Sequence, residues 1–132
     1  MLLIDSGNSR IKWVLAKGAA WLCQGAVEQA GRATLPQAFA ALPPPRKIVA
    51  ANVAGEEVAQ HIRAACAAWS CPVEFIVAVA EQCGVRNRYE QPAQLGSDRW
   101  AALIAAWQRE RAACLVVNCG TATTVDALSA QG

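Results

Sequence analysis

Three short segments of the sequence combine residue types that could hold phosphate or move a proton. Residues 5–9 read Asp-Ser-Gly-Asn-Ser directly after an apolar run, and residues 118–122 read Asn-Cys-Gly-Thr-Ala after a second run. Between them, Asp98 and Arg99 place a carboxylate beside a guanidinium. Phosphoryl transfer uses parts of this kind, because it depends on positioned donors, a metal ion and a group that orients the attacking hydroxyl.

The two glycine-bearing segments have the composition of phosphate-binding turns. A glycine at a strand–turn–strand corner lets consecutive backbone N–H groups approach an anion without interference from a Cβ. The side chains of Asn8, Ser9 and Thr121 add donors, and Asp5 would hold Mg²⁺ directly or through water. Taken alone, either segment is explained more simply as an ordinary β-turn, and neither is a Walker loop or a dinucleotide fingerprint.

Asp98 and Arg99 lie where a long helix is predicted to begin. A carboxylate in the first helical turn stays ionised near the helix N-terminus and could accept a proton from a substrate hydroxyl that attacks the γ-phosphate. Arg99 offers a planar fork for a substrate carboxylate. The simpler alternative is a helix-capping acid followed by a solvated charge.

The apolar pattern predicts the elements that would position these groups. Strands are predicted near residues 2–4, 11–15, 20–26, 48–51, 73–77 and 115–117, with a hairpin over 120–128. Helices are predicted from Thr34, as the cap, to the prolines at 43–45, over 56–69, and from about 96 to 113. Residues 82–95 are predicted to form an ordered loop. This order indicates a mixed α/β sheet.

The segments at residues 2–9 and 115–122 match each other in pattern, which coincidence explains as well as an internal repeat does. With a repeat, residues 1–95 form a first domain with a phosphate loop, 96–113 a linking helix with a substrate motif, and 114–132 the start of a truncated second domain. An open strand edge at a natural terminus is unusual, so we expect the 132 residues to be a fragment.

Composition narrows the functional classes. The chain has 55% hydrophobic and 17% charged residues with a net charge of +2, which is typical of a soluble globular protein. It has no basic run for nucleic acid, no apolar segment long enough for a membrane span and no signal peptide, so we expect a cytoplasmic protein without nucleic-acid or membrane contact. Six cysteines without a CxxC pair, and with His61 as the only histidine, predict free thiols rather than a zinc site.

Three motifs together resemble type III pantothenate kinases over nearly the whole chain. They are residues 4–12, the stretch from Asn87 to Tyr89 with Pro92 and residues 95–99, and residues 118–123. The resemblance implies an actin-like ATPase (ribonuclease H-like) fold of duplicated α/β domains. It also implies ATP-dependent phosphorylation of pantothenate to 4'-phosphopantothenate, the first step of coenzyme A biosynthesis.

By the same resemblance, residues take specific roles. Asp98 would be the general base, and Mg²⁺ would accompany ATP, held by Asp5 through water. The first phosphate loop would comprise Asp5, Ser6, Gly7, Asn8, Ser9, Arg10, Ile11 and Lys12, and the second Gly120 and Thr121. Pantothenate would be bound by Tyr89, Gly96, Ser97, Asp98 and Arg99.

The family often has Asp at the position of Asn118, where it is associated with an activating monovalent cation, K⁺ or NH₄⁺. Asn118 offers a carbonyl oxygen without the charge, so the cation requirement is open. The resemblance also implies a homodimer. Trp100 and Trp107 fit a subunit interface as well as a core, whereas Trp13, Trp21 and Trp69 are predicted to be core residues.

The truncation predicts a poor catalyst, because the family's adenosine pocket and a further pantothenate contact lie beyond residue 132. A non-catalytic relative acting as a transcriptional accessory or binding module is the alternative function, and a kinase or ATPase for another substrate is a third. Retention of Asp5, Asp98 and Arg99 favours the enzyme.

Overall fold

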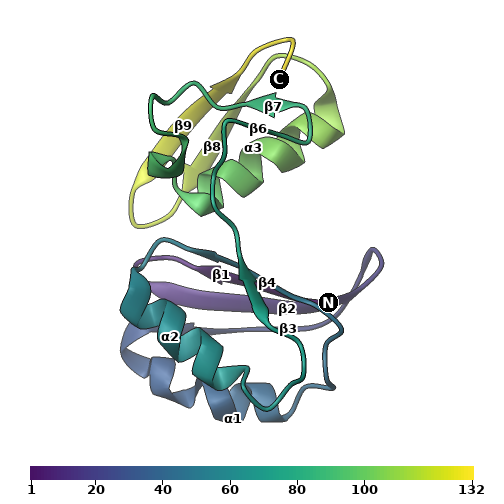
Figure 1. Cartoon of the computed structure of the whole chain (residues 1–132), viewed down its shortest axis with the longest axis vertical. Coiled ribbons are helices and arrows are strands. Elements are labelled where there is room, and N and C mark those ends of the chain that lie inside the picture. The colour runs from purple at the N-terminus through teal and green to yellow at the C-terminus, as the bar shows by residue number, and fades with distance from the viewer. The chain divides into compact units, whose positions relative to one another are not determined.

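The computed structural model describes residues 1–132 as two compact units, Met1–Ile76 and Val77–Gly132 (Figure 1). Residues 77–95, which the sequence analysis assigned to the first domain, therefore pack with the later part of the chain. The predicted domain scheme rests on an internal duplication, and it stays a prediction.

Unit 1, Met1–Ile76, contains a five-stranded mixed sheet with strand order β3-β2-β1-β4-β5. Strand β1 (Leu2–Ser6) pairs antiparallel with β2 (Arg10–Lys17), and β2 pairs antiparallel with β3 (Ala20–Glu28). On its other side β1 pairs parallel with β4 (Ile48–Asn52), which pairs parallel with β5 (Val73–Phe75). The predicted mixed α/β sheet is confirmed, and it places the first glycine-bearing turn at the end of the central strand.

Helical segments connect these strands and cover one face of the sheet (Figure 1). They are the 3₁₀ helix η1 (Gln29–Thr34), α1 (Leu35–Ala40) and α2 (Glu56–Ala65). Helix α1 begins after Thr34 as predicted, but the Thr34 hydroxyl donates to the carbonyl oxygen of Gly31 at 2.8 Å instead of capping the helix. The predicted helix over 56–69 ends at Ala65 and continues only as turns.

The core of unit 1 lies between the sheet and the helices. Phe39 is its largest fully buried side chain, and its ring stacks on Trp69 at 5.7 Å and meets Trp13 edge-on at 5.4 Å between ring centroids. The prediction that Trp21 is a core residue is wrong, because its side chain is 69% exposed. Trp21 lies beside the turn of the β2–β3 hairpin, which projects beyond the helices (Figure 1).

Unit 2, Val77–Gly132, is built on helix α3 (Ser97–Glu110), which packs against the antiparallel strands β8 (Cys114–Cys119) and β9 (Thr123–Leu128). Trp100, Leu103 and Trp107 are buried, so both tryptophans belong to the core of this unit. The helix ends at Glu110, earlier than predicted, because Arg111 adopts the left-handed conformation with φ of 49°.

The predicted loop over residues 82–95 contains short regular elements. Strands β6 (Glu81–Gln82) and β7 (Val85–Arg86) form a hairpin, and Pro92–Gln94 forms the 3₁₀ helix η2. The two residues between the strands, Cys83 and Gly84, have φ of 54° and 81°, the positive values that a tight two-residue hairpin turn favours. The loop is therefore anchored to α3 rather than irregular throughout, since Gln108 donates to the Cys83 carbonyl at 2.7 Å.

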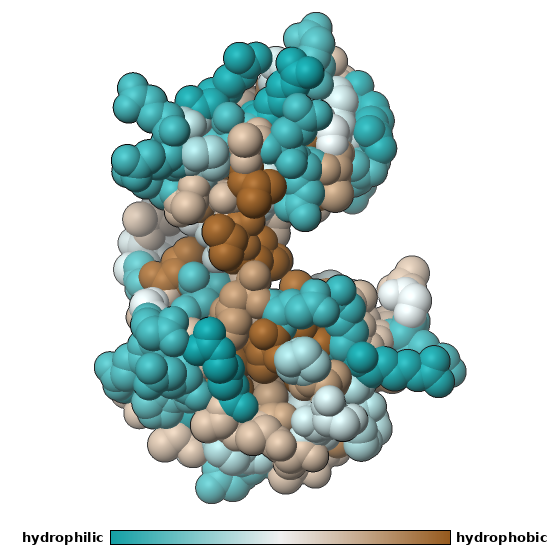
Figure 2. Space-filling view, viewed as in Figure 1, coloured by the Kyte–Doolittle hydropathy of each residue, from teal (hydrophilic) through white to brown (hydrophobic).

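Both hydrophilic and hydrophobic residues reach the surface of the chain (Figure 2). In unit 2, alternation along β8 and β9 leaves Leu115, Val117 and Val125 exposed. None of the helices combines the length and apolar character needed to cross a membrane.

Candidate active site

The first candidate loop is the corner between β1 and β2. Ser6 at the end of β1 is 1% exposed, and its carbonyl oxygen accepts the Val53 N–H at 3.0 Å, which ties the corner to the end of β4. The Gly7 N–H donates to the Arg10 carbonyl oxygen at 3.0 Å and closes the turn. The Gly7 N–H is therefore used within the turn. A bound anion would contact the other polar groups of the loop.

Ion pairs surround this corner. Asp5 and Lys12 are cross-strand partners, and the Lys12 Nζ lies 3.4 Å from the Asp5 Oδ2. Arg10 Nε lies 2.8 Å from Glu28 Oε1 on β3. Both pairs are exposed, and such pairs contribute only about 0–1 kcal/mol, so a metal ion or a phosphate could rearrange them at little cost.

Gln29, which follows β3, holds the loop from outside. Its Nε2 donates to the Gly7 carbonyl oxygen at 2.7 Å and to the Ser6 Oγ at 3.3 Å, and its backbone N–H donates to the Ser9 carbonyl oxygen at 2.9 Å. One residue thus binds three residues of the corner. Sequence reasoning missed Gln29 because no motif contains it.

The second candidate loop joins β8 to β9 in unit 2. The Gly120 N–H donates to the Ala122 carbonyl oxygen at 3.2 Å, so this glycine also closes its turn. Asn118 pairs with Thr124 across the strands, and the Thr124 hydroxyl is buried without a hydrogen-bond partner in the chain. Two neutral side chains that carry oxygen are therefore cross-strand partners in the β8–β9 hairpin.

The third candidate group lies at the start of α3. Gly96 is the N-cap residue, and Asp98 is an exposed acid in the first turn whose Oδ1 accepts the Arg99 N–H at 2.8 Å. Asn87 orders the preceding segment, since its side chain donates to the Pro92 carbonyl at 3.0 Å and accepts the Tyr89 N–H at 3.1 Å. These bonds bring Tyr89 to the beginning of the helix.

Arg99 connects this group to β9. Its Nε donates to the Asp126 Oδ2 at 2.9 Å, its Nη2 donates to the Asp126 Oδ1, and its Nη1 lies 3.4 Å from the Tyr89 hydroxyl. The hydrogen bond to Asp126 raises the pKa of the Arg99 guanidinium, with a further contribution from Tyr89 and against the effect of burial. The contacts with Asp126 and Tyr89 hold the Arg99 guanidinium in place, so it is not merely a solvated charge.

The structure thus brings Tyr89, Asp98 and Arg99 together in unit 2 and the residues of the first loop together in unit 1. Asp126 was missed by sequence reasoning. The available signal was its place in β9, where it shares a strand face with Thr124 and Leu128, because an acid on the inward face of a strand needs a cation.

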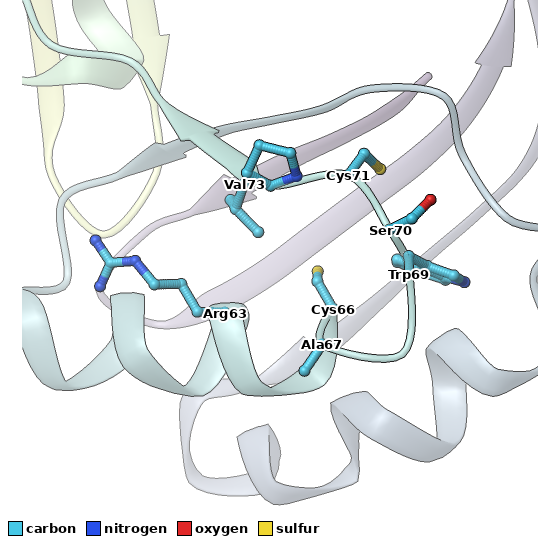
Figure 3. Close-up of a pocket in the computed structure, with 8 residues that line it drawn as sticks. Arg63, Cys66, Ala67, Trp69, Ser70, Cys71 and Val73 are labelled. Atoms are coloured by element: carbon cyan, nitrogen blue, oxygen red, sulfur yellow. The ribbon is translucent and has the colours of Figure 1, made fainter.

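A cavity of about 460 Å³ lies elsewhere in unit 1, at the end of α2 (Figure 3). It is lined by Arg63, Cys66, Trp69, Cys71 and Val73 together with neighbouring small residues, and none of the predicted site residues reaches it. Arg63 is engaged with Glu56 at 2.7 Å and lies over the Phe75 ring. The cavity therefore offers apolar walls and thiols without a free charge, and it is not the candidate active site.

The comparisons with known proteins agree on one family. A family model described as type III pantothenate kinase matches residues 1–132. A curated protein named type III pantothenate kinase from Aromatoleum aromaticum is 54% identical over 132 residues, which cover 100% of this chain and 54% of that protein.

Two further curated proteins with the same name are similar to the chain. The one from Nitrosospira multiformis is 51% identical over 132 residues, covering 100% of this chain and 50% of that protein. The one from Nitrosomonas eutropha is 52% identical over 133 residues, covering 100% of this chain and 52% of that protein. The chain spans about half the length of the curated relatives it matches.

Proposed function

The chain belongs to the type III pantothenate kinase family, and from this premise we propose that the whole protein containing it phosphorylates pantothenate with ATP. The product would be 4'-phosphopantothenate, and the step would be the first of coenzyme A biosynthesis. The observation that carries the proposal is that the family match spans every residue of both units, including the Tyr89–Asp98–Arg99 group.

For the fold, we propose an actin-like ATPase domain followed by the opening hairpin of a duplicated second domain. The strand order β3-β2-β1-β4-β5 supports this for unit 1, with β2 and β3 joined by antiparallel pairing on one side of β1 and β4 and β5 joined by parallel pairing on the other. The β1–β2 and β8–β9 hairpins support the duplication, because each has a glycine whose N–H closes the turn after an apolar strand.

The residues of the first loop fit the phosphates of ATP with Mg²⁺. Mg²⁺ commonly binds through one or two carboxylates, water and substrate phosphates, and Asp5 is the carboxylate present at this corner. Bound Mg²⁺ would neutralise charge on the phosphates. Lys12 would turn from Asp5 toward the same phosphates.

At the start of α3, Asp98 would act as the general base. Its exposed carboxylate accepts one N–H bond through Oδ1, which leaves Oδ2 to accept the proton of the pantothenate hydroxyl as that oxygen bonds to the γ-phosphorus. The bond between the γ-phosphorus and the bridging oxygen of ATP breaks, and ADP leaves. Arg99 and Tyr89 would bind the pantothenate carboxylate, and Gly96 with Ser97 would form the adjoining backbone.

The oxygens of Asn118 and Thr124 fit a monovalent cation better than a divalent one. Both are neutral ligands, and the Thr124 hydroxyl is a buried oxygen without a hydrogen-bond partner in the chain. We propose K⁺ or NH₄⁺ near these residues, with Gly120 and Thr121 of the same hairpin receiving phosphate. A homodimer and a cytoplasmic location remain predictions of the sequence, and the burial of Trp100 and Trp107 removes them as support for the dimer.

A coupled ADP-release assay tests the proposal. The whole protein is assayed with Mg-ATP, with and without pantothenate and with K⁺, NH₄⁺ or neither, and the 132-residue chain is assayed beside it. We expect ADP release that depends on pantothenate in the whole protein and little or none in the chain alone. A folded whole protein that releases no ADP with either cation would contradict the proposed function and favour the non-catalytic alternative, which no feature of the structure favours now.

A further inference from the structure

We propose that Asp126 is a positioning residue that fixes Arg99 for recognition of the substrate carboxylate. This inference rests on the proposed function and deepens it. Asp126 accepts the Nε and Nη2 bonds of Arg99 through its two oxygens, so the pair joins the first turn of α3 to β9. Two parallel bonds from a planar guanidinium define its orientation as well as its position.

The pair decides which edge of Arg99 is left for a ligand. A guanidinium has one edge formed by Nε and Nη2 and another formed by Nη1 and Nη2. Asp126 occupies the first edge, and Tyr89 Oη stands 3.4 Å from Nη1. A carboxylate would therefore be received end-on, by Nη1 and the second N–H of Nη2, beside the tyrosine hydroxyl.

The exposed fractions of the two side chains agree with an Arg99 that has one edge paired with Asp126 and the other edge available to a ligand. The Asp126 side chain is 10% exposed, whereas that of Arg99 is 25% exposed. The acid is thus the inner partner, and Arg99 is the member of the pair that reaches solvent. Asp98 and Arg99 are consecutive residues, so an Arg99 that is fixed by Asp126 also fixes the distance between the substrate's carboxylate end and the proposed base.

Two opposing effects of Asp126 can be separated. Its charge partly neutralises Arg99 and weakens attraction to a second carboxylate, whereas its two bonds remove rotational freedom from a long side chain before the ligand arrives. If orientation dominates, loss of Asp126 weakens binding of a carboxylate substrate. If neutralisation dominates, the same change strengthens it, so the direction of the change tests the inference.

The test compares Asp126→Asn with Glu81→Gln in the whole protein. Glu81 forms an exposed pair with Arg86 at 3.3 Å on the β6–β7 hairpin, so it is a matched acid-to-amide control in the same unit. The substrates are pantothenate and pantothenol, in which a hydroxymethyl group replaces the carboxylate. KM and kcat are measured for each substrate and for ATP, with thermal unfolding to monitor the fold.

We expect Asp126→Asn to raise KM for pantothenate about tenfold, with kcat and the KM for ATP within about threefold of wild type. The preference for pantothenate over pantothenol should fall by a similar factor. Glu81→Gln should change none of these values. If Asp126→Asn does not fold, Asp126→Glu retains the charge but displaces the guanidinium, and it should show the same loss of preference.

The outcomes separate this inference from the proposed function. A wild-type protein that does not phosphorylate pantothenate overturns both. If the wild type is active and the Asp126 variants keep its preference for pantothenate over pantothenol, the positioning role alone is overturned. The same holds if the KM values for both substrates rise equally while stability falls, because Asp126 would then only stabilise the contact between α3 and β9. A lower KM for pantothenate in Asp126→Asn also overturns it, because neutralisation would then outweigh orientation.

Discussion

Replacing Gln29 by alanine should weaken the use of ATP without changing any residue of the phosphate motif. The substitution removes the Nε2 bonds to the Gly7 carbonyl and the Ser6 hydroxyl but keeps the backbone bond from residue 29 to Ser9. The Ser6–Gly7 part of the β1–β2 corner would then lose the side-chain hydrogen bonds that hold it from outside the hairpin. A looser corner would present its polar groups to a phosphate in many orientations.

The magnitude follows from the two bonds. A typical hydrogen bond contributes a net of about 0.5–1.5 kcal/mol, and a buried acceptor left unpaired costs about 1–3 kcal/mol. The bond to Gly7 is short at 2.7 Å, the bond to the buried Ser6 is long at 3.3 Å, and removal of the unpartnered Gln29 Oε1 offsets part of the loss. We expect a net loss of about 1–2 kcal/mol, which corresponds to about a five- to thirtyfold change in a binding constant.

The assay is ADP release at saturating pantothenate with ATP varied, for wild type, Gln29→Ala and Gln24→Ala. Gln24 is exposed on β3, the strand that precedes Gln29, and is the matched control. We expect a higher KM for ATP in Gln29→Ala alone, with the KM for pantothenate unchanged. Wild-type kinetics in a variant whose melting temperature falls would refute the argument, because Gln29 would then stabilise unit 1 without shaping a phosphate site.

Three further predictions test the catalytic assignment and the packing. Asp98→Asn should lower kcat by a factor of about 10² or more at unchanged melting temperature, and an unchanged rate would remove Asp98 from the mechanism. Gly25→Ala should destabilise unit 1 by about 1–3 kcal/mol in urea unfolding, because the new Cβ would lie 2.3 Å from the Trp13 ring. Gly31→Ala is its control, since nothing lies within 4 Å of that position, and equal effects would contradict the clash. Burial, with a contribution from a neighbouring thiol, raises the pKa of Cys66 from 9.0 to about 11. The unfolded thiol therefore ionises first as pH rises, so stability should be full below about pH 9 and decline toward pH 11. Cys66→Ala should flatten that decline in thermal unfolding, and identical slopes would refute the assignment.

The sequence predicted those parts of the fold that depend on local periodicity. The alternation of Ile11, Trp13 and Leu15 in β2 corresponds to a face packed in the core, and the helical spacing of Trp100, Leu103 and Trp107 corresponds to a buried face of α3. The exposure of Trp21 was not predictable, because it depends on where the hairpin ends relative to the helices rather than on the residue's hydrophobicity. Strands as short as β6 and β7 have no period to detect.

The candidate site divides in the same way, between what residue type reveals and what only tertiary structure provides. Asp5, Asp98 and Arg99 were identifiable because their chemistry suits phosphoryl transfer, but Gln29 in η1 and Asp126 in β9 support that chemistry from positions distant in sequence. The sequence nevertheless limits which residues can act as supports. An arginine placed for binding near the start of a helix and an acid on the inward face of a strand each need a group of opposite charge nearby. Arg99 and Asp126 satisfy both requirements with one contact. An acid of this kind, on the inward face of a strand after a glycine-bearing turn, is therefore a reason to search for the arginine that it orients.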